Sequence, residues 1–187
     1  MKILTICGSP RKKGNTGKVL NMFNDEISDG HEIEHINLID FDVKGCIGCM
    51  KCQEDSEEPG CVQNDDANSI FGKMMDADAV VYASPLYCWS FTAQMKPLID
   101  RHFCMCFGYG TPEYKSFLEG KKVALLVTCG GPIEENTEFI QGIFDNLSGF
   151  MNMNNAGKYL LPSCTEPEAI GEEGKTLAAA MAKAITS

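Results

Sequence analysis

The 187-residue sequence lacks both long apolar runs and an excess of basic side chains. No stretch approaches the ~18 consecutive apolar residues of a membrane-spanning helix. Lys and Arg number 16 against 26 Asp and Glu, and the resulting net charge of -10 repels nucleic acid and anionic lipid. We therefore expect neither nucleic acid nor a membrane as a partner. The apolar segment in MKILTICGSPRKK is too short for a signal peptide, which predicts a cytoplasmic protein.

Histidines are also few, and two common nucleotide-binding motifs are missing. Nothing pairs His31, His35 or His102 with a nucleophile, so a structural role is the better interpretation for each. The stretch GSPRKKGNT is neither a Walker loop nor a G-x-G-x-x-G fingerprint. These absences argue against a P-loop NTPase and weaken the case for a dinucleotide-binding Rossmann domain.

Five short apolar runs, each followed by a stretch of helical periodicity, make up most of the chain. This alternation is typical of a parallel sheet with right-handed crossovers and helices on both faces. We expect one doubly wound α/β domain over residues 1–187, in which Asp66 caps the second helix and Phe139 belongs to the apolar face of the fourth. The expected strands are Lys2–Cys7, Glu32–Leu38, Ala79–Pro85, Lys121–Cys129 and Gly157–Cys164.

Ligands of such sheets bind at the carboxyl ends of the strands, which directs attention to three loops. The loop from Gly8 to Thr16 holds hydroxyl groups, three consecutive cations and a glycine directly before a helix. Backbone N–H groups and the helix dipole at such a position favour a phosphate. The first loop therefore predicts a phosphate site.

The loops after the third and fourth strands add an aromatic and a backbone-lined surface. Tyr87 and Trp89 flank a turn, which suits a flat aromatic ligand at a strand end. In TCGGP, Gly130 and Gly131 let the backbone approach a ligand closely. A phosphate, a flat ring and a backbone-lined edge together describe FMN.

The stretches GSPRKKGNT, SPLYCWSFTAQMKPLIDR and TCGG, in this order, resemble the NADPH-dependent FMN reductase and iron–sulfur flavoprotein family of the flavodoxin-like superfamily. The resemblance covers nearly the whole chain. It implies a five-stranded sheet in flavodoxin order, non-covalent FMN, and a homodimer or homotetramer. The implied FMN-binding residues are Ser9, Arg11, Asn15, Thr16, Pro85, Leu86, Tyr87, Trp89, Ser90, Thr128, Cys129, Gly130 and Gly131.

Further expectations follow from this family. Asp100 and Arg101 match its K-x-x-x-D-R helix end, where we expect a structural ion pair or a subunit contact. The segment 103–120 is our candidate for a dimer surface. Because FMN carries the chemistry, no catalytic side chain is expected. We expect NAD(P)H as the hydride donor and a quinone, a flavin or another small molecule as the acceptor; the alternative is an electron carrier that serves a protein partner.

Ten cysteines in a reducing compartment argue against a disulfide framework. Isolated ones such as Cys88, Cys129 and Cys164 are expected to be small buried side chains. The stretch GCIGCMKCQEDSEEPGC differs because it is dense in cysteine, and it belongs to a loop, 44–64, inserted after the second strand. Its four cysteines are Cys46, Cys49, Cys52 and Cys61.

Three interpretations of this cysteine loop stay open. The resemblance implies a 4Fe–4S cluster, and three cysteines two residues apart can turn their sulfurs toward one cluster. Zinc is an alternative, although zinc motifs more often come as two separated pairs. A structural loop without metal is the third, because the gap before Cys61 is longer than in cluster-binding relatives. The acids in that gap disfavour free thiolates; they are Glu54, Asp55, Glu57 and Glu58.

Overall fold

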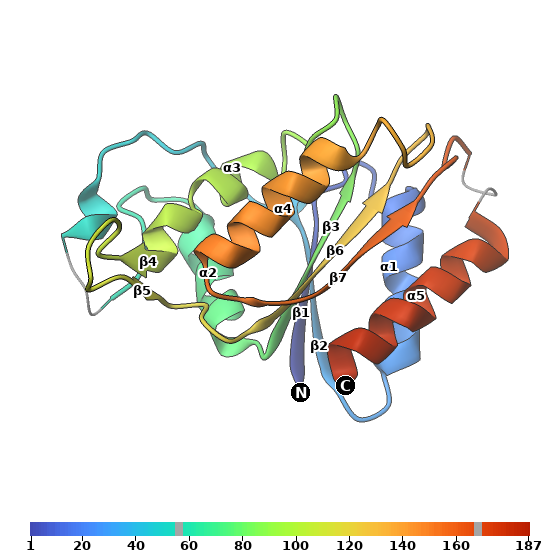
Figure 1. Cartoon of the computed structure of the whole chain (residues 1–187), viewed down its shortest axis with the longest axis horizontal. Coiled ribbons are helices and arrows are strands. Elements are labelled where there is room, and N and C mark those ends of the chain that lie inside the picture. The colour runs from blue at the N-terminus through green and yellow to red at the C-terminus, as the bar shows by residue number, and fades with distance from the viewer. Residues whose placement is uncertain (55–57, 167–169) are drawn as a thin grey trace.

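A five-stranded parallel sheet forms the centre of the computed structural model, which describes residues 1–54, 58–166 and 170–187 (Figure 1). The strand order is β2-β1-β3-β6-β7, with all four neighbouring pairs parallel. This is the flavodoxin order, so the predicted fold class is confirmed. The strands are β1 (Lys2–Cys7), β2 (Glu32–Asn37), β3 (Ala79–Pro85), β6 (Lys122–Thr128) and β7 (Asn154–Leu161).

Helices cover both faces of the sheet. In β1, Ile3 and Cys7 pack with the core on one face while Leu4 and Ile6 pack on the other, because successive strand residues alternate. The first face is covered by α1 (Asn15–Ile27) and α5 (Gly171–Thr186), which lie side by side. The opposite face is covered by α2 (Ala67–Asp76), α3 (Lys96–Asp100) and α4 (Glu138–Phe150).

The segment after β3 is less helical than its apolar spacing predicts. Only α3 is an α-helix, and a 3-10 turn, His102–Met105, follows it. Pro97 explains the late start, because proline is tolerated in the first helical turn but not in the interior. A short antiparallel pair that the sequence pattern did not predict comes next: β4 (Cys106–Phe107) and β5 (Lys115–Ser116).

Three local expectations are wrong in detail. Asp66 occupies the N-cap position of α2, but its carboxylate accepts a hydrogen bond from the Asp42 N–H (2.7 Å) instead of capping the helix. Phe139 is 71% exposed, so it lies outside the apolar face of α4. The last strand begins at Asn154, before the predicted start, because polar residues pair there with β6 through their backbone. Among the described residues, no helix is both long and apolar enough to cross a bilayer.

Candidate functional site

A groove of about 520 Å³ opens at the carboxyl ends of the parallel strands. The loops after β1, β3, β6 and β7 all contribute to it. Most of the residues predicted to bind FMN line this groove; they are Ser9, Arg11, Asn15, Thr16, Pro85, Leu86, Tyr87, Thr128, Cys129 and Gly130. An adjoining hollow of about 350 Å³ shares Leu86, Cys129 and Gly130 and adds Trp89 and Gly131. Ser90 lines neither space.

The first turn of α1 presents bare backbone N–H groups to the groove. Gly14 is the N-cap residue, no side chain within the described ranges caps the helix, and the first turn contains no acid. The loop packs tightly against this turn: a Cβ added to Gly17 would lie only 2.6 Å from the Lys12 carbonyl oxygen. An uncapped helix N-terminus of this kind attracts an anion such as a phosphate.

Side-chain hydrogen bonds hold the loop and leave one acceptor unused. Ser9 Oγ accepts from the Arg11 N–H (3.1 Å) and donates to the Arg11 carbonyl (3.0 Å). Asn15 Nδ2 donates to the Cys164 carbonyl (2.9 Å), and the Thr16 and Thr128 hydroxyls lie 2.7 Å apart. Asn15 Oδ1 is buried and has no hydrogen-bond partner in the described part of the chain. It is an acceptor, so it fits a hydroxyl group of a ligand.

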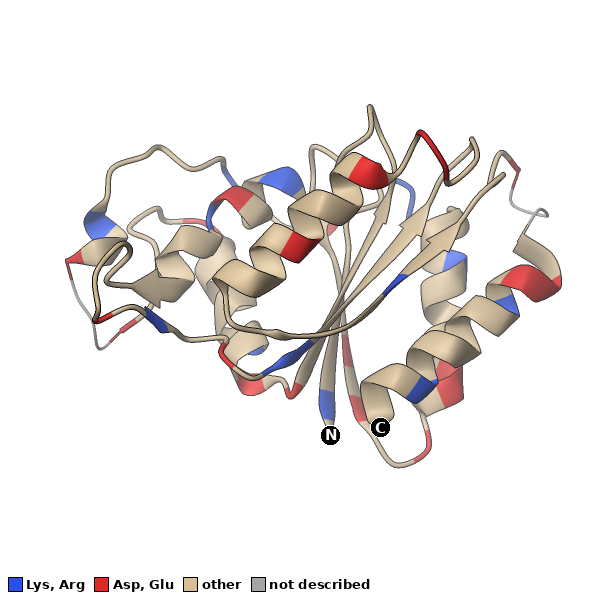
Figure 2. Cartoon of the chain, viewed as in Figure 1, with Lys and Arg blue, Asp and Glu red and all other residues tan. Residues whose placement is uncertain are grey.

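Charge is distributed unequally around the groove. The loop between β1 and α1 carries the exposed basic residues Arg11, Lys12 and Lys13, and the loop leading into α4 carries acids, among them Glu134 and Glu135 (Figure 2). Lys12 forms an ion pair with Asp40 at 2.5 Å. The basic side coincides with the uncapped N-terminus of α1, which reinforces the preference for an anion there.

A two-residue hairpin turn forms the aromatic side. Tyr87 and Ser90 exchange two backbone hydrogen bonds of 3.2 and 3.0 Å, and between them Cys88 and Trp89 have φ values of 46° and 61°. Two consecutive non-glycine residues in the left-handed region store strain, which is typical of functional sites. Trp89 is 55% exposed at this tip. Cys88 is also exposed, so the expectation that it is buried is wrong.

The far side of the groove is neutral and close to the backbone. Leu86 donates its N–H to the Thr128 carbonyl (2.9 Å), which joins the hairpin to the loop after β6. Burial raises the pKa of the Cys129 thiol, and burial with the nearby Cys129 and Glu173 raises that of Cys164 to about 11. Both thiols are therefore uncharged near neutral pH and place no negative charge beside the basic loop.

Sequence reasoning missed the contribution of the last strand to the groove. Cys164 and Thr165, which follow β7, line it together with Lys12 and Lys13. The signal was present, since this loop also lies at the carboxyl end of a parallel strand.

The four clustered cysteines line a second, much smaller cavity of about 40 Å³, which shares no lining residue with the groove. Its other walls are largely apolar: Ile47, Met50, Val62, Phe103 and the buried Cys104. Among the described residues, no three His, Cys, Asp or Glu side chains stand in the arrangement of a single-ion site. Of the acids in the loop, Asp55 and Glu57 lie outside the described residues.

Nitrogen donors point at several of these sulfurs. The Gly48 N–H donates to Cys46 Sγ (3.4 Å), and Gln63 Nε2 lies 4.0 Å from Cys61 Sγ. Gln53 Nε2 also lies 3.8 Å from Cys52 Sγ, but its two hydrogens are donated to the Phe103 and Cys106 carbonyls (3.1 and 2.9 Å). N–H···S contacts of this kind favour thiolates and are common around iron–sulfur clusters.

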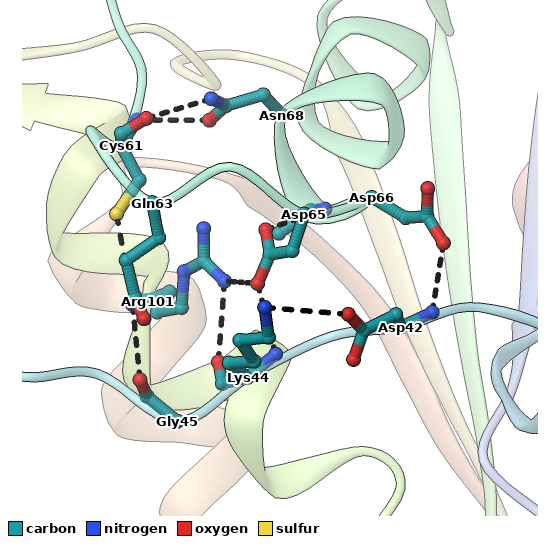
Figure 3. Close-up of polar contacts among 10 residues, drawn as sticks. Asp42, Lys44, Gly45, Cys61, Gln63, Asp65, Asp66, Asn68 and Arg101 are labelled. Atoms are coloured by element: carbon teal, nitrogen blue, oxygen red, sulfur yellow. Dashed lines mark hydrogen bonds and ion pairs between the residues drawn. The ribbon is translucent and has the colours of Figure 1, made fainter.

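One residue that lines the cavity, Arg101, belongs to a buried ion pair (Figure 3). Arg101 donates from Nη1 to the Asp65 carboxylate and to the Lys44 carbonyl (3.2 Å), and the two charged side chains are 1% and 0% exposed. Burial alone would raise the pKa of Asp65, but the Arg101 hydrogen bond and the Lys44 and Ala67 N–H groups outweigh it and lower this pKa. Arg101 thus has its ionic partner in Asp65, while Asp100 pairs with Lys96 (2.5 Å).

Comparison with known proteins identifies the family. The model of the NADPH-dependent FMN reductase family matches residues 1–166. The chain belongs to this family. A curated relative from Archaeoglobus fulgidus, named iron-sulfur flavoprotein, is 34% identical over 153 residues, which is 81% of this chain and 61% of that protein. YwqN of Bacillus subtilis, named as an NAD(P)H-dependent FMN-containing oxidoreductase, is 28% identical over 96% of this chain and 94% of its own.

Solved structures agree on the fold of this FMN reductase family member. An azoreductase from Bacillus anthracis aligns with a TM-score of 0.75 at 18% identity, covering all of both chains. An NAD(P)H:quinone oxidoreductase from Methanothermobacter marburgensis aligns with a TM-score of 0.74 at 20% identity over 98% of each chain. The chain spans 61%, 55% and 48% of the length of three curated iron-sulfur flavoproteins that it matches, so their activities are not transferred with the fold.

Proposed function

We propose that this protein is an FMN-dependent oxidoreductase that takes hydride from NAD(P)H and passes electrons to a quinone, a flavin or another small acceptor. One observation carries the proposal: the uncapped N-terminus of α1, the basic loop and the aromatic hairpin all meet in a single groove. The family match and the named oxidoreductase relative support it.

The residues of the groove fit the parts of FMN. The phosphate would be bound by the first-turn N–H groups of α1 and by Arg11, since Ser9 Oγ is already engaged within the loop. Asn15 Oδ1, the unused buried acceptor, would take a hydrogen bond from a ribityl hydroxyl. Thr16 and Thr128 join the two loops through their hydroxyls and keep this part of the groove in place.

The flat ring would lie between the hairpin and the loop after β6. Tyr87 and Trp89 offer aromatic surface on one side, and Gly130 and Gly131 offer backbone on the other. Bound FMN supplies the hydride and electron transfer. The chain's contribution is to orient the ring, keep part of it dry, and leave an open side on which a nucleotide and then an acceptor can bind.

Anaerobic mixing with a reduced nucleotide tests the proposal. Purified protein saturated with FMN is mixed with NADH or NADPH, and loss of the visible flavin absorbance is followed. We expect bleaching with at least one nucleotide and recovery of the colour when a quinone is added. Retention of the flavin colour with both nucleotides would contradict the reductase proposal.

A matched pair of variants tests the groove itself. Asn15→Ala removes the buried acceptor and the hydrogen bond to Cys164, so we expect FMN to bind several-fold more weakly. Asn21→Ala changes an exposed residue of the same helix and should leave FMN affinity unchanged. Equal FMN affinities in the two variants would show that Asn15 does not contribute to FMN binding.

A second candidate function is electron transfer through a 4Fe–4S cluster in the cysteine cavity. It is favoured by the common cavity of Cys46, Cys49, Cys52 and Cys61 and by the N–H groups directed at their sulfurs. Several relatives are named iron-sulfur flavoprotein. The chain would then pass electrons between the cluster and FMN, and onward to a small acceptor or a protein.

Iron and acid-labile sulfide analysis of anaerobically purified protein tests this second candidate. About four irons per chain are expected for a 4Fe–4S cluster, and Cys49→Ser should lower the iron content sharply. Iron near zero after reconstitution would contradict the cluster without affecting the FMN proposal. Assembly as a homodimer or homotetramer through residues 103–120 stays a prediction, which light scattering coupled to size exclusion can test.

A further inference from the structure

The nitrogens of the Arg101 guanidinium differ in their hydrogen bonding. Nη1 is held by the Asp65 carboxylate and the Lys44 carbonyl, as Figure 3 shows. Nε and Nη2 are also buried, yet neither makes a hydrogen bond to any other described residue. A buried donor without a partner is rare, because its loss of water is not compensated. Its position therefore requires an explanation.

The unused edge of the guanidinium faces the cysteine cavity. Arg101 is one of the residues that line the cavity, and in Figure 3 its guanidinium lies between the Asp65 carboxylate and the sulfur of Cys61. Asp65 binds the guanidinium from behind, so the donors are fixed in orientation before any ligand arrives.

We propose that Arg101 is a positioning residue of the cysteine site, whose Nε–H and Nη2–H donate to sulfur atoms of a bound iron–sulfur cluster. This inference rests on the second candidate function above. The Arg101–Asp65 pair is neutral overall, but its positive end faces the sulfurs. Reduction of the cluster adds one negative charge, which N–H donors at the sulfurs stabilise more strongly than they stabilise the oxidised form.

The shape of arginine is central to the assignment. One planar guanidinium can bind Asp65 through one edge and present two N–H groups along the other, whereas a lysine ammonium is a point charge on a flexible stem. Arg101→Lys can keep the ion pair with Asp65 but cannot reach the sulfurs with a second fixed edge. The two roles of the residue, structural and electronic, can therefore be separated by this substitution.

The experiment measures the reduction midpoint of the cluster. Wild type and Arg101→Lys are reconstituted anaerobically with ferrous iron and sulfide, and the cluster is titrated with dithionite while its EPR signal is recorded. We expect the equilibrium constant for reduction to fall about tenfold in Arg101→Lys, which equals a midpoint lower by about 59 mV for a one-electron couple. FMN content, measured on the same samples, reports whether the fold is intact.

Two more variants test whether a general change in charge, or a failure of Arg101→Lys to fold, explains the result. Lys44→Gln removes one positive charge from the residue whose backbone carbonyl binds Arg101, but this side chain is 56% exposed, so we expect a shift of less than a third of that in Arg101→Lys. The double variant Asp65→Asn/Arg101→Gln removes both charges together and leaves no unpaired buried ion, so it should fold even if Arg101→Lys does not. We expect the same lowering of the midpoint in it.

Three outcomes would overturn the inference. The first is a midpoint in Arg101→Lys, or in the double variant if Arg101→Lys does not fold, that equals that of wild type. The second is an equal shift in Lys44→Gln, since net charge alone would then suffice. The third is a wild-type protein that takes up no iron, and in that case normal FMN binding and NAD(P)H bleaching would show that the proposed oxidoreductase function still holds.

Discussion

The groove and the cysteine cavity both present N–H groups, but they are built in opposite ways. The groove is wide and open, and its donors are backbone groups at the end of α1 beside a basic loop. The cavity is small and apolar, and its side-chain donors are Gln63 from the cysteine loop itself and Arg101 from the end of α3. An oxyanion suits the first environment and thiolate sulfur the second.

The difference shows which kind of site depends on the fold and which on individual contacts. Strand order alone places the groove, because parallel strands end at the same edge and the loops after them meet there. The cavity depends on hydrogen bonds that fasten the two ends of the cysteine loop. Gln63 donates to the Gly45 carbonyl (3.0 Å), and Asp65 accepts from the Lys44 N–H (2.9 Å).

The largest effect is expected from breaking the ion pair beneath the cavity. Asp65→Ala leaves the buried guanidinium of Arg101 without its counter-charge, so we expect the free energy of unfolding to fall by about 3–5 kcal/mol. Urea unfolding followed by circular dichroism measures it. Asp42→Ala, whose side chain is 68% exposed in a surface pair, should change stability by no more than about 0.5 kcal/mol. Similar losses in both variants would contradict a special role of the buried pair.

The next largest effect is expected in the groove. Gly17→Ala places a Cβ 2.6 Å from the Lys12 carbonyl oxygen, and only movement of the loop can relieve this contact. We expect FMN affinity to fall by at least about tenfold, measured by flavin fluorescence titration, since misplaced donors lose their hydrogen bonds.

Gly72→Ala is the matched control for that prediction. A Cβ there meets nothing within 4 Å, and the position lies inside α2. We expect unchanged FMN affinity and a gain in stability of about 0.5–1 kcal/mol from the better helix former. If Gly17→Ala also binds FMN normally, the tight winding of the phosphate loop has no role in binding.

A buried histidine is expected to make the stability of the fold sensitive to acid. His102 is 1% exposed; its Nδ1 bonds the Leu98 carbonyl (2.8 Å), and its Nε2 lies 2.6 Å from the Tyr82 hydroxyl. Burial lowers its pKa from 6.5 to about 4, so the folded protein holds it neutral. In the unfolded chain His102 can take up a proton at a higher pH than in the folded protein. The free energy of unfolding therefore decreases as the pH falls from about 6.5 toward 4.

The expected loss is about 2 kcal/mol between pH 7.5 and pH 5. Urea unfolding at the two pH values measures it, and His102→Gln should show a correspondingly smaller difference. An equal difference in the variant would assign the acid sensitivity to other groups.

Apart from the control variants Asp42→Ala and Gly72→Ala, the smallest effect on stability is expected at the aromatic hairpin, where we expect a gain. Replacing Cys88-Trp89 by Asn-Gly supplies the residues that a turn with two positive φ values prefers, so we expect a gain of about 1 kcal/mol. Loss of the Trp89 ring should at the same time slow reduction of the bound flavin by NAD(P)H. Cys88→Asn alone, which keeps Trp89, separates the two effects. A double variant that is less stable and equally active would show that the hairpin carries no strain for function.

The candidate groove was predictable from the sequence to a large extent, and the cavity was not. The strands are recognisable as apolar runs, and three loop sequences stand at their carboxyl ends: GSPRKKGNT, SPLYCWS and TCGG. The sequence therefore predicts that these loops meet at one edge of the sheet. The solvent exposure of Cys88 could not be predicted, because the left-handed turn that exposes it depends on hydrogen bonds between Tyr87 and Ser90. The contacts of Gln53 and Arg101 likewise join segments about 50 residues apart, which local patterns do not encode.

The sequence by itself determined the parallel α/β sheet, the edge at which the candidate groove opens, and the presence of four cysteines in one loop. Hydrophobic periodicity and chain connectivity are local or topological, and they suffice for these. Only the tertiary structure decided that Arg101 pairs with Asp65 and not with Asp100, and that its second edge faces the cysteine cavity. The choice of partner for a buried charge depends on which groups packing excludes from water, and this is settled only when distant segments meet.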